Sequence, residues 1–471
     1  MKHPFLKLLN ILILLNPYII FSQNTFEKGY GTLDDDVGYS VVETSDNGYF
    51  ISGFTTNYYY GNPEIYTIKT NASGDVEWTH SGNHPNLRNR AYKGIQSFDG
   101  GYITCSNIVE LPSYNYRCIL TKFSSNGILE WEKYYGMNVF SIQKALIQTV
   151  DSGFITCGYG FYSYSNYIAS IYKLDESGNV IWSKEYTETG ATTTLNDITD
   201  SYDNGFMLCG TVGCDGSCNT GWVMKIDTLG NKEWETKISA DDGNITFYSI
   251  TKANDSTYIA CGKKWSGSIF PFRESDVFIV KIDLNGNKLW EITYGEDDIE
   301  EYAAEVDIAD DGNYIITGSN GSQTLLIKVS EQGDILWDQI FDIGTGGTSL
   351  CTTSDNGYAM CGGSLKFGYG LLDVYLLKTN ADGIMTSTNS GNIAVSDIKL
   401  YPNPTNSNCI IESKDKIENV SVYNLNGKIL QHISPLANYV NLNTLKFESG
   451  IYILKIETAN IVEVRRLVVN H

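Results

Sequence analysis

The sequence has few basic residues and little histidine or methionine. Its 471 residues include 33 Lys and Arg against 55 Asp and Glu, which leaves a formal net charge of −22. Nucleic-acid binding needs a basic face, so this balance excludes nucleic acid as a partner. Only five His and six Met stand beside 45 Gly and 33 Tyr. That composition favours strands and turns over helices.

Histidine is too scarce to suggest a catalytic or metal centre. The repeated part of the chain holds His80 and His84 in one short loop with Gly82 and Pro85. Gly and Pro oppose the helix on which such a pair binds a metal well, so hydrogen-bonded imidazoles in a loop are the simpler interpretation. We predict no cofactor and no metal site. Paired carboxylates for glycoside cleavage stay open, because acidic residues are plentiful.

Long apolar runs are absent beyond the N-terminus. Lys2 and Lys7 flank the start of a largely apolar segment, residues 8–21, and this pattern predicts a signal peptide over residues 1–22. The segment is short and is broken by Asn16-Pro17, so we expect cleavage and not a membrane span. We therefore predict an exported protein with no transmembrane segment in the mature chain.

Seven copies of one motif follow the signal segment. They start roughly 52 residues apart, with one longer and one shorter interval. The copies are DNGYFISG (46–53), DGGYITCS (99–106), DSGFITCG (151–158), DNGFMLCG (203–210), DSTYIACG (255–262), DGNYIITG (311–318) and DNGYAMCG (355–362). A recurrence of this length indicates a repeat architecture.

Each copy sits in a unit that predicts four short strands. In the first unit these cover residues 39–45, 48–55, 64–70 and 75–80, with turn residues between them. Six units end on a tryptophan, which we expect to wedge between neighbouring units: Trp78, Trp131, Trp182, Trp234, Trp290 and Trp337. Four-stranded units repeated radially make a β-propeller, so the sequence predicts an all-β fold with a seven-bladed propeller over residues 23–386.

The seventh unit lacks a terminal tryptophan and a fourth strand. Near the N-terminus, Phe26 opens FEKGYG, which closely matches WEKYYG at Trp131. We expect residues 25–31 to supply the missing outer strand of blade seven. That exchange joins the two ends of the ring and removes an open sheet edge.

A separate module follows the polar linker predicted at residues 387–396. Residues 397–471 contain LYPNPTN, VSVYNLNGKILQ, VNLNTLKFESGIYILKI and RRLVV in that order. This set resembles the type A C-terminal sorting domain of the type IX secretion system. The resemblance implies a small β-sandwich, recognition by the type IX secretion machinery, and a final place on the cell surface or outside the cell. The motif residues are Pro402, Asn403, Pro404, Gly427, Gly450 and Tyr452. The repeats likewise resemble β-propeller repeats of Bacteroidetes surface proteins.

Ten cysteines occur in this exported chain. Five share one slot of the second strand, where we expect small apolar packing groups: Cys105, Cys157, Cys209, Cys261 and Cys361. Cys214 and Cys218 share one loop of blade four and could form a disulfide. A cross-strand pair of Cys105 with Cys118 is a further alternative.

The loops between the second and third strands are aromatic and emerge on one propeller face. Our candidate ligand-binding residues there are Tyr58, Tyr60, Tyr114, Tyr116, Tyr162, Tyr164, Trp265, Phe272 and Tyr369. Aromatic planes beside amides and carboxylates suit sugar rings. The alternative is that these rings only pack loops onto one another. Acidic clusters share the face, and we interpret them as solvated turns in preference to calcium sites.

Three functions are compatible with this sequence. The first is a non-catalytic binding or adhesion propeller for a glycan or protein ligand, acting as a monomer. The second is a carbohydrate-active enzyme, a hydrolase or lyase. The third is a structural surface-layer protein. The aromatic face favours the first over the third. Scarce histidine and near-regular repeats favour the first over the second, although fold alone decides nothing.

Overall fold

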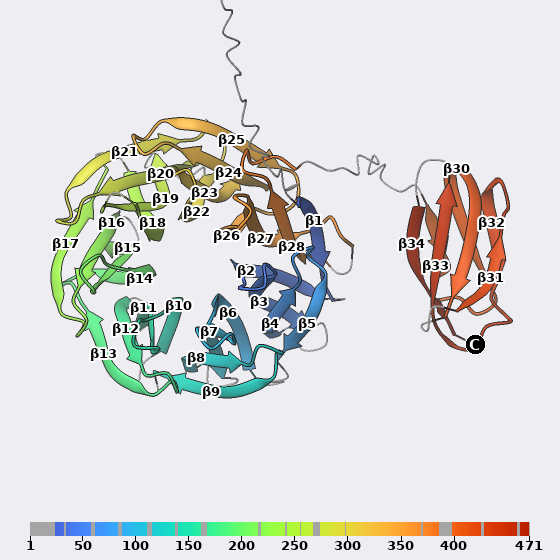
Figure 1. The fold of residues 1–471 in the computed structure, drawn as a ribbon, viewed down its shortest axis with the longest axis horizontal. Coiled ribbons are helices and arrows are strands. Elements are labelled where there is room, and N and C mark those ends of the chain that lie inside the picture. The colour runs from blue at the N-terminus through green and yellow to red at the C-terminus, as the bar shows by residue number, and fades with distance from the viewer. Residues whose placement is uncertain are drawn as a thin grey trace, which may run out of the picture. The chain divides into compact units, whose positions relative to one another are not determined.

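Every sequence repeat folds as one four-stranded antiparallel sheet in the computed structural model (Figure 1). The structure describes residues 24–470 except 33, 58–61, 83–86, 111–114, 137–139, 162–166, 215–217, 241–242, 255, 267–273, 297, 369–370, 386–397, 425–427 and 459–461. The predicted signal peptide, 1–22, lies outside the described residues. The chain divides into two units, residues 1–386 and 387–471.

The first unit is a seven-bladed propeller. Its blades, in chain order and from the innermost strand outward, are β2 (Asp35–Glu43), β3 (Tyr49–Asn57), β4 (Asn62–Thr70) and β5 (Val76–Ser81); β6 (Leu87–Gln96), β7 (Tyr102–Glu110), β8 (Asn115–Phe123) and β9 (Leu129–Tyr135); β10 (Phe140–Gln148), β11 (Phe154–Phe161), β12 (Tyr167–Leu174) and β13 (Val180–Tyr186); β14 (Thr192–Asp200), β15 (Phe206–Cys214), β16 (Cys218–Ile226) and β17 (Lys232–Ile238); β18 (Gly243–Lys252), β19 (Tyr258–Ser266), β20 (Glu274–Ile282) and β21 (Lys288–Tyr294); β22 (Glu301–Ile308), β23 (Tyr314–Asn320), β24 (Gln323–Val329) and β25 (Ile335–Phe341); and β26 (Gly347–Thr352), β27 (Tyr358–Ser364) and β28 (Asp373–Thr379), completed by β1 (Phe26–Tyr30). None of the described residues is helical, so no helix in this part of the chain could cross a membrane.

The N-terminal strand closes the ring. β1 pairs antiparallel with β28, with Phe26 opposite Lys378 and Tyr30 opposite Val374. The sheet order β1-β28-β27-β26 therefore joins the two ends of the propeller within blade seven (Figure 1). The prediction of seven blades closed by the N-terminal strand is confirmed.

One aromatic ring docks each blade onto a glycine of the next. A Cβ added to Gly127 would lie 2.5 Å from the Trp78 ring, and one added to Gly230 would lie 2.8 Å from Trp182. The remaining pairs are Trp131 with Gly178, Trp234 with Gly286, Trp290 with Gly333, Trp337 with Gly383, and Phe26 with Gly74. These glycines also have positive φ, so the turn and the ring both require the missing side chain.

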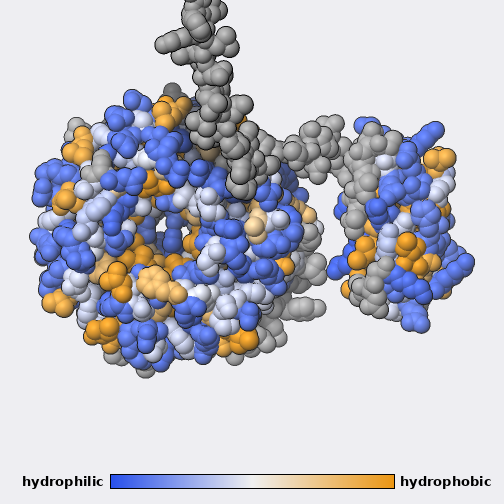
Figure 2. Space-filling model, in the orientation of Figure 1, coloured by the Kyte–Doolittle hydropathy of each residue, from blue (hydrophilic) through white to orange (hydrophobic). Residues whose placement is uncertain are grey.

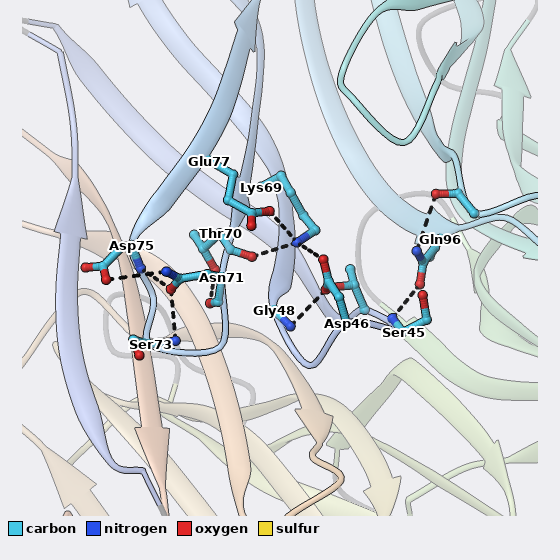
Figure 3. Close-up of polar contacts among 12 residues, drawn as sticks. Ser45, Asp46, Gly48, Lys69, Thr70, Asn71, Ser73, Asp75, Glu77 and Gln96 are labelled. Carbon is cyan, nitrogen blue, oxygen red and sulfur yellow. Dashed lines mark hydrogen bonds and ion pairs between the residues drawn. The ribbon is translucent and has the colours of Figure 1, made fainter.

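A buried lysine stands on the third strand of each blade. The Lys69 ammonium lies 2.8 Å from both Asp46 and Glu77 and donates to the Thr70 carbonyl at 2.7 Å (Figure 3). Its side chain is only 1% exposed. Equivalent lysines occupy the third strand of the other blades: Lys122, Lys173, Lys225, Lys281, Lys328 and Lys378. A buried ammonium needs such partners because desolvation of an unpaired charge is costly.

The second unit is a smaller β domain with one core. It contains β29 (Lys399–Tyr401), β30 (Asn408–Tyr423), β31 (Ile429–Ile433), β32 (Ala437–Asn443), β33 (Gly450–Thr458) and β34 (Val462–Val469). The first half of β30 pairs with β29 and β32, and its second half pairs with β31 and β33. The long strand thus belongs to two layers, and Ile411, Leu442 and Leu454 are buried in the core between them.

Removal of the Phe26 ring should weaken ring closure. We expect Phe26→Ala to lower the free energy of unfolding by about 2 kcal/mol, because this half-buried ring fills the space beside Gly74. Urea unfolding followed by tryptophan fluorescence measures this in the full chain, since all eight Trp lie in the propeller. Phe98→Ala is the control, because that ring is 68% exposed. Equal effects of the two variants would contradict closure by β1.

The lysine–aspartate pairs should make the propeller sensitive to acid. Burial alone would raise the pKa of Asp46, but hydrogen bonds from Lys69, Thr44 and Gly48 lower it to about 2. The pKa values of Asp99 and Asp203 are also lowered to about 2, by hydrogen bonds from Lys122 and Lys225 that outweigh burial.

Because an unfolded Asp titrates near pH 3.9, stability from these pairs is present above about pH 4. It should be lost as the pH falls toward about 2. The triple variant Asp46→Asn, Asp99→Asn, Asp203→Asn should show a flatter fall in unfolding free energy over that window than the wild type. The exposed control Asp382→Asn should keep the wild-type slope. Parallel curves for the wild type and the triple variant would show that the pairs do not carry the acid sensitivity.

Candidate ligand-binding site at the mouth of the central channel

The innermost strand of every blade has one bulged residue at the same place. The register between the first and second strands slips by one residue in all seven blades, as between Gly38 and Ser40. The extra residue always stands seven positions before the Asp of the repeat motif. These residues are Tyr39, Tyr92, Lys144, Asn196, Tyr248, Ala304 and Thr348. A β-bulge changes the direction in which a side chain points, and here it affects one residue in each blade.

In six of the seven blades the last residue of the repeat motif is a glycine that packs against this bulge, and in blade two it is Ser106. A Cβ on Gly210 would lie 1.9 Å from the carbonyl oxygen of Thr194, and one on Gly262 would lie 1.9 Å from that of Thr246. No side chain fits against a backbone oxygen at that distance. The glycine therefore accompanies the bulge in six blades but is not required for it, since Ser106 stands there in blade two, while the bulged residue itself varies from blade to blade.

Five tyrosines gather around the channel. The rings of Tyr39 and Tyr92 stack with centroids 5.3 Å apart and planes inclined by 2°. Tyr248 and Tyr302 meet edge to face at 6.2 Å. Tyr159 on β11 completes the set, and all five side chains are half-buried. Figure 2 shows the central opening of the propeller in the space-filling view. We call these five residues the tyrosine collar.

A cavity of about 300 Å³ opens between blades three, four and five. It takes Tyr159, Tyr248 and Trp265 as aromatic walls. The other lining residues are Lys144, Tyr167, Thr192, Thr194, Asn196, Thr211, Asn219 and Thr246. They belong to the ends of the strands nearest the loops that join the second and third strands. We call this the mouth cavity.

The chemistry of the mouth cavity is aromatic, hydroxyl and amide. Among the residues that line it, none is Asp, Glu or His. Burial raises the pKa of Tyr159 and of Tyr248 to about 12, so both phenols keep their protons and can donate hydrogen bonds at neutral pH. Ring faces together with such donors and acceptors fit a neutral or polar ligand that has apolar faces.

Lys144 brings the only formal charge among the lining residues. Its ammonium lies 5.7 Å from the centre of the Tyr159 ring. Burial lowers the pKa of Lys144. A second lysine, Lys263, lies near the cavity over the Trp265 ring at 4.3 Å, but it pairs with Glu300 at 3.4 Å.

One step farther along each innermost strand lies a polar belt. It consists of Ser40, Lys93, Ala145, Asp197, Ser249, Glu305 and Ser349, the residues that follow the bulges. Lys93 and Glu305 form an ion pair across the channel. Burial lowers the pKa of Lys93, but the attraction of Glu305 and Asp197 outweighs it and raises that pKa. Burial raises the pKa of Asp197, and Lys93 opposes this.

The belt satisfies backbone groups that face the channel. The Ile250 amide donates to Asp197 at 3.0 Å, and the Leu350 amide donates to Glu305 at 2.9 Å. The Val41 amide donates to the Ser349 hydroxyl at 3.0 Å. Each acceptor belongs to the preceding blade, so these hydrogen bonds link neighbouring blades. They also satisfy backbone amides of the innermost strands, which are the edge strands of their sheets. We assign it a structural role.

Few of the aromatic loop residues fall where the structure is described. Trp265 lines the mouth cavity, and Tyr116 meets Phe161 edge to face at 5.5 Å. The others lie outside the described residues: Tyr58, Tyr60, Tyr114, Tyr162, Tyr164, Phe272 and Tyr369. Trp265 and Tyr116 do not meet in one site, because Tyr116 is not among the lining residues.

The sequence reasoning missed the tyrosine collar and Lys144. It searched the loops, whereas these residues lie on strands. For Lys144 and three of the tyrosines the signal was present as the position seven residues before the motif Asp, where seven otherwise regular repeats carry five different residue types. Only the bulge explains why that position faces the channel.

The cysteines have mixed outcomes. Cys105, Cys157, Cys209, Cys261 and Cys361 are buried free thiols. Cys105 and Cys118 are also free, with sulfur atoms 3.8 Å apart. Cys214 and Cys218 are paired in register at the ends of β15 and β16, and their side chains lie outside the described residues. Their disulfide stays a prediction.

The described sorting-motif residues make identifiable contacts in the second unit. The Asn403 side chain donates to the Arg466 carbonyl and accepts from the Val468 amide, both at 2.8 Å. It thereby ties the Pro402–Pro404 turn to β34. The Tyr452 ring packs on Phe447 at 5.1 Å, and Gly450 opens β33. Gly427 lies outside the described residues.

The fold and these motifs define an exported β-propeller that carries a C-terminal sorting domain. Residues 399–470 match the family described as secretion system C-terminal sorting domain. That match shows the type IX tail expected from the sequence, which implies export to the cell surface or beyond. A search of curated proteins finds no match to the chain.

Solved structures similar to this chain are distant. A streptogramin B lyase shares 13% identity, with a TM-score of 0.46 over 75% of this chain and 97% of its own. PorZ, a surface component of the type IX secretion system of Porphyromonas gingivalis, shares 11% identity, with a TM-score of 0.44 over 94% of this chain and 60% of its own. The polysaccharide lyase Uly1 shares 9%, with a TM-score of 0.49 over 78% and 94%. Likenesses this distant say nothing about what the chain binds.

Proposed function

We propose that this chain is a non-catalytic propeller that binds a glycan in its mouth cavity at the cell surface and acts in adhesion. The observation that carries the proposal is the lining of that cavity. Tyr159, Tyr248 and Trp265 offer ring faces, and threonine and asparagine side chains offer hydrogen bonds between them. Sugar rings have apolar C–H faces and hydroxyl edges, so both kinds of group would be used.

The cavity lining supports binding over hydrolysis. Glycoside hydrolysis ordinarily uses two carboxyl groups that flank the scissile bond. The mouth cavity has no carboxyl group among its lining residues, and Asp197 and Glu305 are engaged in the polar belt. The tyrosine phenols are protonated because burial raises their pKa values to about 12, which disfavours a tyrosinate base.

The cavity lining also supports binding over a purely structural role. A propeller that served only as a coat would gain nothing from half-buried rings around an open channel. Tyr248 and Trp265 both line the cavity, so part of each ring faces space that a ligand could fill. Partly exposed aromatic groups that gather in one hollow are typical of binding sites.

Loss of an aromatic wall should abolish most glycan binding. We expect Tyr248→Ala and Trp265→Ala each to weaken binding of any glycan retained on an array at least about tenfold, a loss of about 1.4 kcal/mol. Tyr134→Ala is the matched control, because that tyrosine lies on the outer strand β9 and is 42% exposed. Product analysis on each retained glycan accompanies the array. New sugar products, or unchanged binding by both cavity variants, would overturn the proposal.

Removal of the C-terminal domain should block surface delivery. We expect a chain truncated after residue 396 to accumulate inside the cell, because the type IX machinery would no longer recognise it. Protease accessibility on whole cells and blotting of the medium measure this. Asn403→Ala tests the turn separately, since it removes the two bonds to β34 without shortening the chain. Undiminished surface or medium protein from the truncated chain would show that residues 397–471 carry no address.

A further inference from the structure

The mouth cavity contains one lysine, Lys144, to which the described residues offer no carboxylate. Lys69, Lys122 and Lys225 are buried and each lies within 3.3 Å of carboxylate oxygens. Lys93 in the polar belt pairs with Glu305. Lys144 makes no ion pair with any described residue, and its ammonium lies over the Tyr159 ring.

The surroundings of Lys144 are polar but uncharged. Beside it the cavity is lined by Thr192, Thr194 and Asn196, and the nearest aromatic face is Tyr159. A desolvated ammonium without a counter-ion is costly, as the lowered pKa of Lys144 reflects. Six buried lysines of the blades have a carboxylate partner, whereas Lys144 faces a cavity. An incoming anion would supply the missing negative charge.

We propose that the glycan taken by the mouth cavity is acidic, and that its carboxylate or sulfate ester pairs with Lys144 while a sugar ring contacts Tyr248 or Trp265. This inference rests on the glycan-binding function proposed above. Lys144 comes from blade three, Tyr248 and Trp265 from blade five, and all three line the one cavity. A single ligand can therefore meet the charge and the rings together.

The acidity of the whole chain does not prevent this pairing. The net charge of −22 acts over distance and is screened within about 8 Å at physiological salt. Inside the cavity the charge among the lining residues is positive, since the lining holds Lys144 and no carboxylate. Its volume of about 300 Å³ is small for a ligand site, which suits the end or a side branch of an acidic saccharide better than a long chain.

The test uses matched acidic and neutral saccharides on the full chain. The probes are a galacturonate oligosaccharide, its fully methyl-esterified form, and a sulfated and an unsulfated galactan oligosaccharide, each titrated calorimetrically. A wider array of such acid–neutral pairs accompanies them. We expect at least tenfold tighter binding of the acidic member of a pair. We expect Lys144→Met to remove that preference, so that the acidic and neutral members of a pair bind within about twofold of each other.

The control is Lys133→Met, which removes a half-buried lysine of the outer strand β9 that does not line the cavity and should keep the preference. Whether the uronate or the sulfated pair shows the preference identifies the anion. Equal binding of acidic and neutral members, or a preference that survives Lys144→Met, would overturn this inference and leave the proposed function standing. A folded wild-type chain that binds no member of any pair would overturn both.

Discussion

The propeller depends on one repeated contact, an aromatic ring of one blade seated on a glycine of the next. Six blades present Trp on the outermost strand and blade seven presents Phe26, and the following blade accepts the ring at a turn glycine with positive φ. The contact leaves no room for a side chain, so it fixes the distance and the angle between neighbouring sheets. Seven blades form a closed ring only if blade seven docks onto blade one by the same kind of contact. The packing of Phe26 on Gly74 is this seventh contact, and β1 carries the Phe26 ring.

A rigid ring allows the innermost strands to carry variation. The bulge recurs in all seven blades and the glycine opposite it in six, so the backbone at the channel is similar from blade to blade. Side chains at the bulge then change freely from Tyr to Lys, Asn, Ala or Thr without disturbing the blades. The next position ties blades together through the polar belt. Blade-to-blade contacts and variable side chains therefore fall on adjacent residues of one strand.

Much of the architecture was predictable because the sequence repeats at a nearly regular interval. The motif spacing gave the blade count, the likeness of FEKGYG to WEKYYG gave the closing strand, and LYPNPTN gave the C-terminal domain. The site was predictable only in part. The aromatic loops lie at the end of the blades where the mouth cavity opens, and Trp265 lines that cavity. Lys144 could not be predicted from the segment QKALIQ alone, because nothing in that segment distinguishes this lysine from the others. Its isolation from carboxylates arises from blades three to five meeting in space, which no single stretch of sequence shows.

The central claim is that a ligand binds in the mouth cavity and not on the outer surface of the blades. The most direct measurement is a crystal structure of the full chain grown with a glycan that it retains. We predict the sugar between Lys144 on β10 and Trp265 on β19, with a ring against Tyr248. A glycan bound against the outer strands, with the mouth cavity empty, would contradict the claim.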